Sequence, residues 1–204
     1  MPFCFPIPAL FRSPRPQRRG TLFAFLGTLL AAVCWLAVSA PAQADTIPVK
    51  SAELRIEDGE VLLNVEFEFS LNPTLEEALE KGIPLYFALD FELTRGRWYW
   101  LDEKVTQTAL VYRVSYNALT RQYRVASGLL TQTFNSLDEV ERFIGRVTSR
   151  RVASADALTK GAKYDAAVRL RLDVNQLPKP FQVNALASRE WTLASDWHRW
   201  SFTP

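Results

Sequence analysis

Residues 52–69 read AELRIEDGEVLLNVEFEF, and apolar and polar side chains alternate in them on both sides of an Asp-Gly pair at 58–59. Alternation with a period of two is typical of a strand that buries one face. Asp-Gly favours a two-residue type I′ turn, because glycine readily adopts the positive φ that this turn requires. Pairing Glu57 with Glu60 across the turn places the apolar side chains of both strands on one face. The stretch therefore predicts an antiparallel hairpin with one buried side.

The same alternation recurs along the rest of the chain. We predict further strands over residues 83–94, 105–116, 121–130, 164–174, 181–186 and 190–202. A tight turn at 95–96 is expected to place Trp98 and Trp100 opposite the core-facing side chains of the preceding strand. The connection at 117–120 is expected to form a third hairpin.

Two short helices are predicted between the strands. Asn72, followed by a proline, is typical of a helix N-cap, and Gly82 is typical of a helix end. Ser136 and Glu139 have the spacing of a capping box, which predicts a second helix that ends near Arg150.

Hairpins with one apolar face each have to bury those faces against one another. The pattern therefore predicts a mainly β fold, an immunoglobulin-like two-sheet antiparallel β-sandwich with two short helices. A β-barrel is the main alternative. No linker divides the strands, so we expect a single domain over residues 45–204.

Residues 1–44 have the composition of a secretory signal peptide. Four arginines and no acidic residue precede an apolar run at 21–38. An Ala-x-Ala pattern then predicts cleavage between Ala44 and Asp45, and with it delivery to the periplasm by the general secretory route. The alternative is an uncleaved anchor in the inner membrane formed by residues 21–38, because eighteen apolar residues approach the length that spans a bilayer.

Removal of this signal changes the charge and the cysteine content of the protein. The whole chain carries a formal net charge of +2, but residues 45–204 have 20 basic and 22 acidic side chains, a net charge of about −2. A nucleic-acid partner is therefore not expected. Both cysteines, Cys4 and Cys34, lie in the signal, so the exported domain is expected to fold without a disulfide.

The exported part of the chain has few residues suited to catalysis. It has one histidine, His198, and no cysteine, which disfavours a zinc site or a Cys-His nucleophile. It has no Gly-x-Ser-x-Gly motif. Carboxylate pairs such as Glu66 and Glu68 are typical of the solvent face of an antiparallel sheet. We therefore expect no enzyme, no cofactor and no metal.

Tryptophan and arginine side chains are better candidates for a binding surface. Both residue types are enriched where proteins bind partners or ligands. The candidates are Tyr99, Trp197, Trp200 and Arg199. Tyr99 and one of the two tryptophans are expected to point outward.

The stretch SLNPTLEEALEKGIPLYFALDFELTRGRWYWLDE at 70–103 resembles a proteobacterial family of exported proteins, domain of unknown function 4390. The shared features are the Asn-Pro helix, the Gly-Ile-Pro-Leu strand entry and the Arg-x-Arg-Trp-Tyr-Trp strand. The stretch LTRQYRVASGLLTQTFNSLDEV at 119–140 also resembles that family. The resemblance implies an envelope location and a gene often close to a membrane sensor histidine kinase of the nitrogen-regulation type, and it supplies no catalytic residue.

These observations together predict a periplasmic, monomeric binding or accessory protein. Its expected partner is a protein of the envelope, such as a sensor histidine kinase or an assembly factor. A carrier of lipids or small ligands is the first alternative and would need a cavity between the apolar strand faces. A hydrolytic enzyme and a purely structural protein are the remaining alternatives.

Overall fold

The computed structural model describes residues 46–96 and 103–204. These residues belong to one compact unit, Gln43–Pro204. The predicted cleavage site at Ala44 and Asp45, the apolar run at 21–38 and the candidate Tyr99 lie outside the described residues. In the part that is described, no helix has the length and the apolar character needed to cross a membrane.

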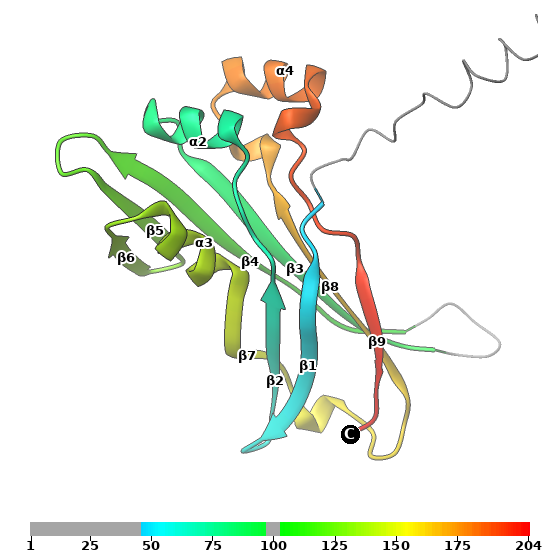
Figure 1. Ribbon diagram of the computed structural model, residues 1–204. Coiled ribbons are helices and arrows are strands. Elements are labelled where there is room, and N and C mark those ends of the chain that lie inside the picture. Colours follow the sequence, from blue (N-terminus) through cyan, green and yellow to red (C-terminus); the bar gives the residue numbers. More distant parts are fainter. Residues whose placement is uncertain (1–45, 97–102) are drawn as a thin grey trace, which may run out of the picture. The chain divides into compact units, whose positions relative to one another are not determined.

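Nine strands and three α-helices form the described domain (Figure 1). The strands are β1 (Val49–Glu57), β2 (Glu60–Phe67), β3 (Leu85–Arg95), β4 (Glu103–Asn117), β5 (Gln122–Ser127), β6 (Leu130–Phe134), β7 (Arg146–Ser154), β8 (Tyr164–Leu172) and β9 (His198–Phe202). The helices are α2 (Pro73–Glu80), α3 (Leu137–Gly145) and α4 (Lys179–Ala187), with 3₁₀ turns at Ala155–Ala157, Val174–Gln176 and Arg189–Trp191.

The strands form two antiparallel sheets, as predicted. A three-stranded sheet has the order β1-β2-β7, and a six-stranded sheet has the order β6-β5-β4-β3-β8-β9. Their inner faces share one apolar core. The centre of the core comes from alternate residues of β3 and β8: Leu85, Phe87, Leu89, Phe91, Leu93, Tyr164, Ala166, Val168, Leu170 and Leu172.

The first hairpin has the predicted register. Glu57 pairs with Glu60 and Leu54 pairs with Leu63. Asp58 and Gly59 both have positive φ, 51° and 77°, as a type I′ turn requires. A short-range sequence signal was sufficient here, because the turn sets the register from the Glu57–Glu60 pair to the Ser51–Glu66 pair, and the pairing shifts only beyond Ser51.

Both predicted helices begin where the sequence indicated. The Asn72 side chain accepts a hydrogen bond from the backbone N–H of Leu75 at 3.0 Å, and the Ser136 hydroxyl accepts one from Glu139 at 3.3 Å. The second helix, α3, ends at Gly145 and not near Arg150 as predicted, because β7 starts at the next residue and pairs with β2.

Strand β7 was not predicted, because its sequence shows no regular alternation. Its pairing with β2 shifts register twice, and Ser149 adopts a φ of 51° within it. Two ion pairs also join β7 to β2. Arg146 pairs with Glu66 at 3.0 Å and Arg151 pairs with Glu60 at 3.1 Å.

The strand predicted over 181–186 is wrong, because these residues lie in α4. Their alternating pattern matches a strand, but Phe181 and Ala185 are four residues apart and pack on one helix face, while Val183 is 69% exposed. The domain therefore has a third helix. The ring of Phe181 lies 6.3 Å from that of Trp191, which is buried.

Two predicted connections also differ from the structure. The turn at 95–96 was expected to pair Thr94 with Arg97, but Thr94 pairs with Lys104, so a longer segment joins β3 to β4. Trp98 and Trp100 fall in that segment, outside the described residues. The strand predicted over 121–130 is divided by a turn at 128–129 into β5 and β6, and Gly128 takes a φ of 59° there.

Candidate functional site

Strand β9 places the predicted candidates on opposite faces of the six-stranded sheet. Trp200 pairs with the buried Ala166 and faces the core, with its ring 6.5 Å from that of Phe91. Arg199 is the next residue along the strand and lies on the outer face, where it pairs with Ala167. Trp197 also lies over this face, so the structure brings Trp197 and Arg199 together and separates Trp200 from them.

Trp197 lies between two arginines. The guanidinium carbon of Arg169 is 4.6 Å from the centroid of the indole ring, and that of Arg199 is 6.0 Å from it. Both distances allow a cation–π interaction. The stacking holds a partly exposed tryptophan in a defined orientation on the outer face of β8 and β9.

A carboxylate fixes the arginines beneath the tryptophan. Asp90 on β3 accepts hydrogen bonds from Arg169 at 3.0 Å and from Arg171 at 2.8 Å. Arg171 also reaches Asp173 at 3.5 Å. The hydrogen bond to Asp90 raises the pKa of Arg171 above its usual value. We call Trp197, Arg169, Arg171, Arg199 and Asp90 the Trp197 surface.

The arginines of the Trp197 surface stay charged throughout the physiological range. Trp197 also borders a shallow hollow of about 210 Å³ beside residues 46–49. His198 faces the other side, with its ring 5.6 Å from that of Trp200. Within residues 46–96 and 103–204, no group of three His, Cys, Asp or Glu side chains is arranged to hold a metal ion.

Ser195 positions the segment that leads to Trp197, a role that no sequence pattern indicated. It is a buried polar residue, 4% exposed. Its hydroxyl accepts the backbone N–H of Leu170 at 3.0 Å, and its own N–H donates to the Leu170 carbonyl at 2.8 Å. The Ser195 side chain thus satisfies a backbone N–H of β8 at a point that lies before the first residue of β9, His198.

We expect Ser195→Ala to lower the free energy of unfolding by about 1–2 kcal/mol, because a buried backbone N–H loses its acceptor. Urea unfolding followed by tryptophan fluorescence measures this change. Ser201→Ala is the matched control, since the Ser201 hydroxyl only contacts Asp165 on the exposed surface at 3.3 Å, and it should cost less than about 0.5 kcal/mol. Equal costs for the two substitutions would show that Ser195 has no special role.

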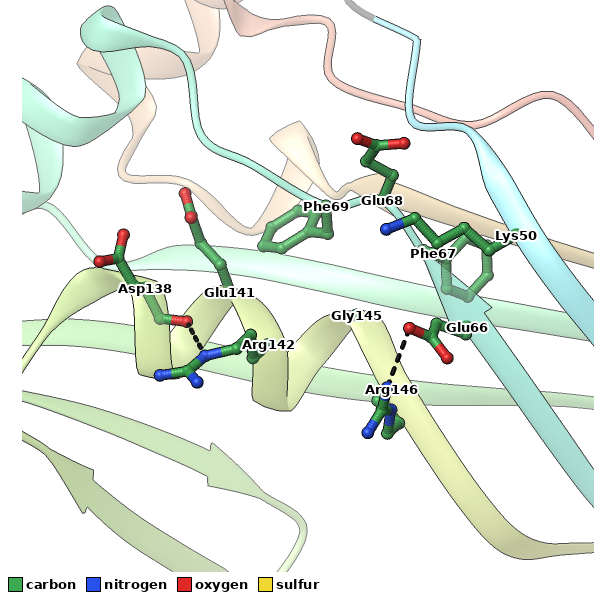
Figure 2. Close-up of a pocket in the computed structure, with 10 residues that line it drawn as sticks. All are labelled: Lys50, Glu66, Phe67, Glu68, Phe69, Asp138, Glu141, Arg142, Gly145 and Arg146. Atoms are coloured by element: carbon green, nitrogen blue, oxygen red, sulfur yellow. Dashed lines mark hydrogen bonds and ion pairs between the residues drawn. The ribbon is translucent and has the colours of Figure 1, made fainter.

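A second hollow, of about 290 Å³, lies between α3 and the C-terminal end of β2 (Figure 2). Figure 2 shows charged side chains of both signs around it, with Arg146 directed to Glu66 and Arg142 to the backbone oxygen of Asp138. Glu141 accepts the backbone N–H of Leu71 at 2.7 Å. Its carboxylate connects α3 to the segment that enters α2, which is a structural role.

Burial raises the pKa of Glu141. The hydrogen bond from the Leu71 N–H lowers this pKa by a smaller amount, and the charge of Asp138 adds to the increase. The folded chain therefore holds this proton more tightly than the unfolded chain. The resulting stabilisation is present below the ordinary glutamate pKa and is lost as the pH rises through the raised value.

The substitution Glu141→Gln tests this pH dependence. The amide oxygen can still accept the Leu71 N–H, but the side chain no longer titrates. We expect the free energy of unfolding of the wild type, minus that of the variant, to be largest at about pH 4 and smallest at about pH 7. Urea unfolding of both proteins at the two pH values measures the difference. A wild-type advantage that grows toward neutral pH would contradict the assignment.

Comparison with known proteins gives a family but no characterised relative. No curated protein and no solved structure matches the chain. The family model described as Domain of unknown function (DUF4390) matches residues 44–201, which include every strand and helix described above except the last residue of β9. The chain therefore belongs to the DUF4390 family.

Proposed function

We propose that the protein is an exported periplasmic binding protein that contacts a protein partner through the Trp197 surface, and that it is not an enzyme. The observation that carries this proposal is the stacking of Trp197 on Arg169, with the guanidinium carbon 4.6 Å from the ring centroid and the guanidinium held by Asp90. A tryptophan fixed in one orientation loses little conformational entropy when it binds.

The shape of the surface favours a protein over a small molecule. The outer face of the sheet has two small residues, Ala88 and Ala167, in the rows that flank Asp90 and Arg169. The hollow beside Trp197 is smaller than the roughly 300–1,000 Å³ of small-molecule sites. Tryptophan and arginine are among the residue types that dominate binding energy between proteins.

The charge of the surface indicates what the partner has to offer. Arg169 and Arg171 are neutralised by Asp90 and Asp173, whereas Arg199 is exposed and forms no ion pair within the described residues. A carboxylate of the partner would complement Arg199, and an apolar or aromatic side chain would cover Trp197. The periplasmic region of a membrane sensor histidine kinase is the partner that the family resemblance favours.

The test is binding between the purified protein and the purified periplasmic region of that kinase. Trp197→Ala should weaken binding by roughly thirtyfold or more, as expected for a hot-spot tryptophan. Arg199→Glu should weaken it by at least about tenfold and increase its sensitivity to salt. The matched control is Arg55→Glu on β1, an exposed arginine of the other sheet whose only described ion pair is with Glu53.

Three outcomes would reject this function. The first is no binding to the kinase region by the wild-type protein. The second is binding that the Arg55 and Arg199 substitutions weaken equally, which would indicate general electrostatic attraction. The third is crosslinking in intact envelopes that captures the kinase as efficiently with Trp197→Ala as with wild type.

A further inference from the structure

The larger sheet extends beyond the smaller one and leaves part of its inner face uncovered. Six strands face three, and helix α3 covers only some of the difference. Phe143 of α3 packs against Phe134 of β6 at 5.2 Å and against Tyr112 of β4 at 6.1 Å. Beside this contact a groove of about 600 Å³ opens between the β4-β5-β6 end of the sheet and β7. We call it the β5-β6 groove.

The floor of the β5-β6 groove is mainly apolar, with Ser127 and Gln132 as polar residues on the same face. Register places Val125 and Leu130 on the same inner face as Leu110 and Tyr112. Leu130 is 72% exposed in spite of this orientation. An exposed leucine on the core-facing side of a sheet has a cost in water, so this end of the sandwich offers apolar surface to a ligand.

The rim of the groove is cationic. Its lining includes Arg146 and Arg150 and contains no aspartate or glutamate. Arg146 is held by Glu66, but Arg150 is exposed and forms no ion pair in the part of the chain that the structure describes. Arg150 and Tyr112 both line the groove. Burial raises the pKa of the Tyr112 phenol, and the charge of Arg150 opposes this by a smaller amount. The guanidinium of Arg150 and the phenol of Tyr112 therefore line the same groove as the apolar side chains of the floor.

We propose that the β5-β6 groove binds a single long-chain carboxylate, a fatty acid. The carboxylate pairs with Arg150 and accepts a hydrogen bond from the Tyr112 hydroxyl, and the alkyl chain lies on Leu110, Val125, Leu130 and Phe143. Charge complementarity selects an anionic head group, because the lining contains no acid and Arg150 is its one arginine without an ion pair among the described residues. The volume falls within the range of small-molecule sites.

An extended peptide fits this groove less well than an alkyl chain. A peptide would have to add a strand to a neighbouring edge. Strand β7 is the edge strand of the small sheet beside the groove, and it is irregular, because its pairing with β2 shifts register twice and Ser149 has a positive φ. Bulges of this kind prevent the continuous pairing that a strand needs. An alkyl chain needs no backbone partner.

The experiment is a calorimetric titration of the purified protein with laurate below its micellar concentration. Dodecyltrimethylammonium, with the same chain length and the opposite charge, is titrated in parallel. Leu130→Glu introduces a like charge on the floor, and Leu119→Glu is its control, because Leu119 is 96% exposed in the β4-β5 turn and outside the groove. Arg150→Gln is compared with Arg151→Gln, whose arginine pairs with Glu60.

We expect one laurate per protein, with binding at least about tenfold weaker in Leu130→Glu and in Arg150→Gln and unchanged in the two controls. No saturable binding of laurate would overturn the proposal. Equal binding of dodecyltrimethylammonium, binding only to phosphatidylglycerol vesicles, or equal effects in variants and controls would do the same. So would a wild-type dimer in sedimentation that Leu130→Glu converts to monomers, because the groove would then be an interface between copies. The Trp197 surface is on the other face of the sheet, so these results are independent of the kinase experiment.

Discussion

Replacing Phe87 by alanine is expected to lower the free energy of unfolding by about 3–5 kcal/mol, the largest effect of any substitution considered for this protein. Phe87 is fully buried at the centre of the six-stranded sheet, between Tyr112 on β4 and Leu172 on β8. Its ring meets that of Phe69 edge to face, with centroids 5.0 Å apart. Removing the ring leaves a cavity that two hydrogen-bonded neighbouring strands cannot close.

Urea unfolding monitored by circular dichroism measures this loss, and Val183→Ala is the control, because Val183 is exposed on α4. A double-mutant cycle with Phe69→Ala should give a coupling of about 0.5–1.5 kcal/mol for the aromatic pair. A cost for Phe87→Ala as small as that of Val183→Ala would mean that the two sheets do not share the core described here.

The parts of the fold that were predictable are those that short stretches of sequence determine. The Asp58-Gly59 turn sets the register of β1 and β2 by itself, and Asn72 and Ser136 start their helices through hydrogen bonds to residues three positions away. The uninterrupted alternation of β8 identified that strand in the same way. Each of these signals acts within a few residues, so no knowledge of tertiary structure was needed.

The parts that were not predictable depend on residues far apart in the chain. Strand β7 is identified by its partners on β2, since Arg146 and Arg151 find Glu66 and Glu60 across the sheet. Helix α4 has a sequence that fits a strand as well as a helix, and the packing of Phe181 near Trp191 distinguishes the two. Periodicity alone contains neither fact.

The candidate surface was predictable only in part, because some of its residues are neighbours in the sequence and others are not. The sequence indicated Trp197 and Arg199 as candidates, because those residue types are adjacent in the chain. Arg169 and Asp90 were missed as members of one cluster, since they join it only when β3, β8 and β9 are neighbours. The available signal was that Asp90 and Arg169, which have opposite charges, occupy paired positions on β3 and β8. Recognising this pairing requires knowledge of the strand order.

Asp90→Ala is expected to lower the free energy of unfolding by about 2–3 kcal/mol, because it leaves Arg169 and Arg171 half-buried without their shared carboxylate. The Asp90 side chain is only 16% exposed, so water replaces it poorly. The matched control is Glu66→Ala, which removes a more exposed pair with Arg146 and should cost no more than about 1 kcal/mol. Urea unfolding of both variants measures the two costs.

Tryptophan fluorescence in native conditions should also change in Asp90→Ala, because the Arg169 guanidinium, without Asp90, no longer has a fixed position against the Trp197 ring. Equal losses in the free energy of unfolding for Asp90→Ala and Glu66→Ala, together with unchanged fluorescence, would mean that Asp90 does not order the Trp197 surface. The contact between the Trp197 indole and Arg169 would then maintain the stacking by itself.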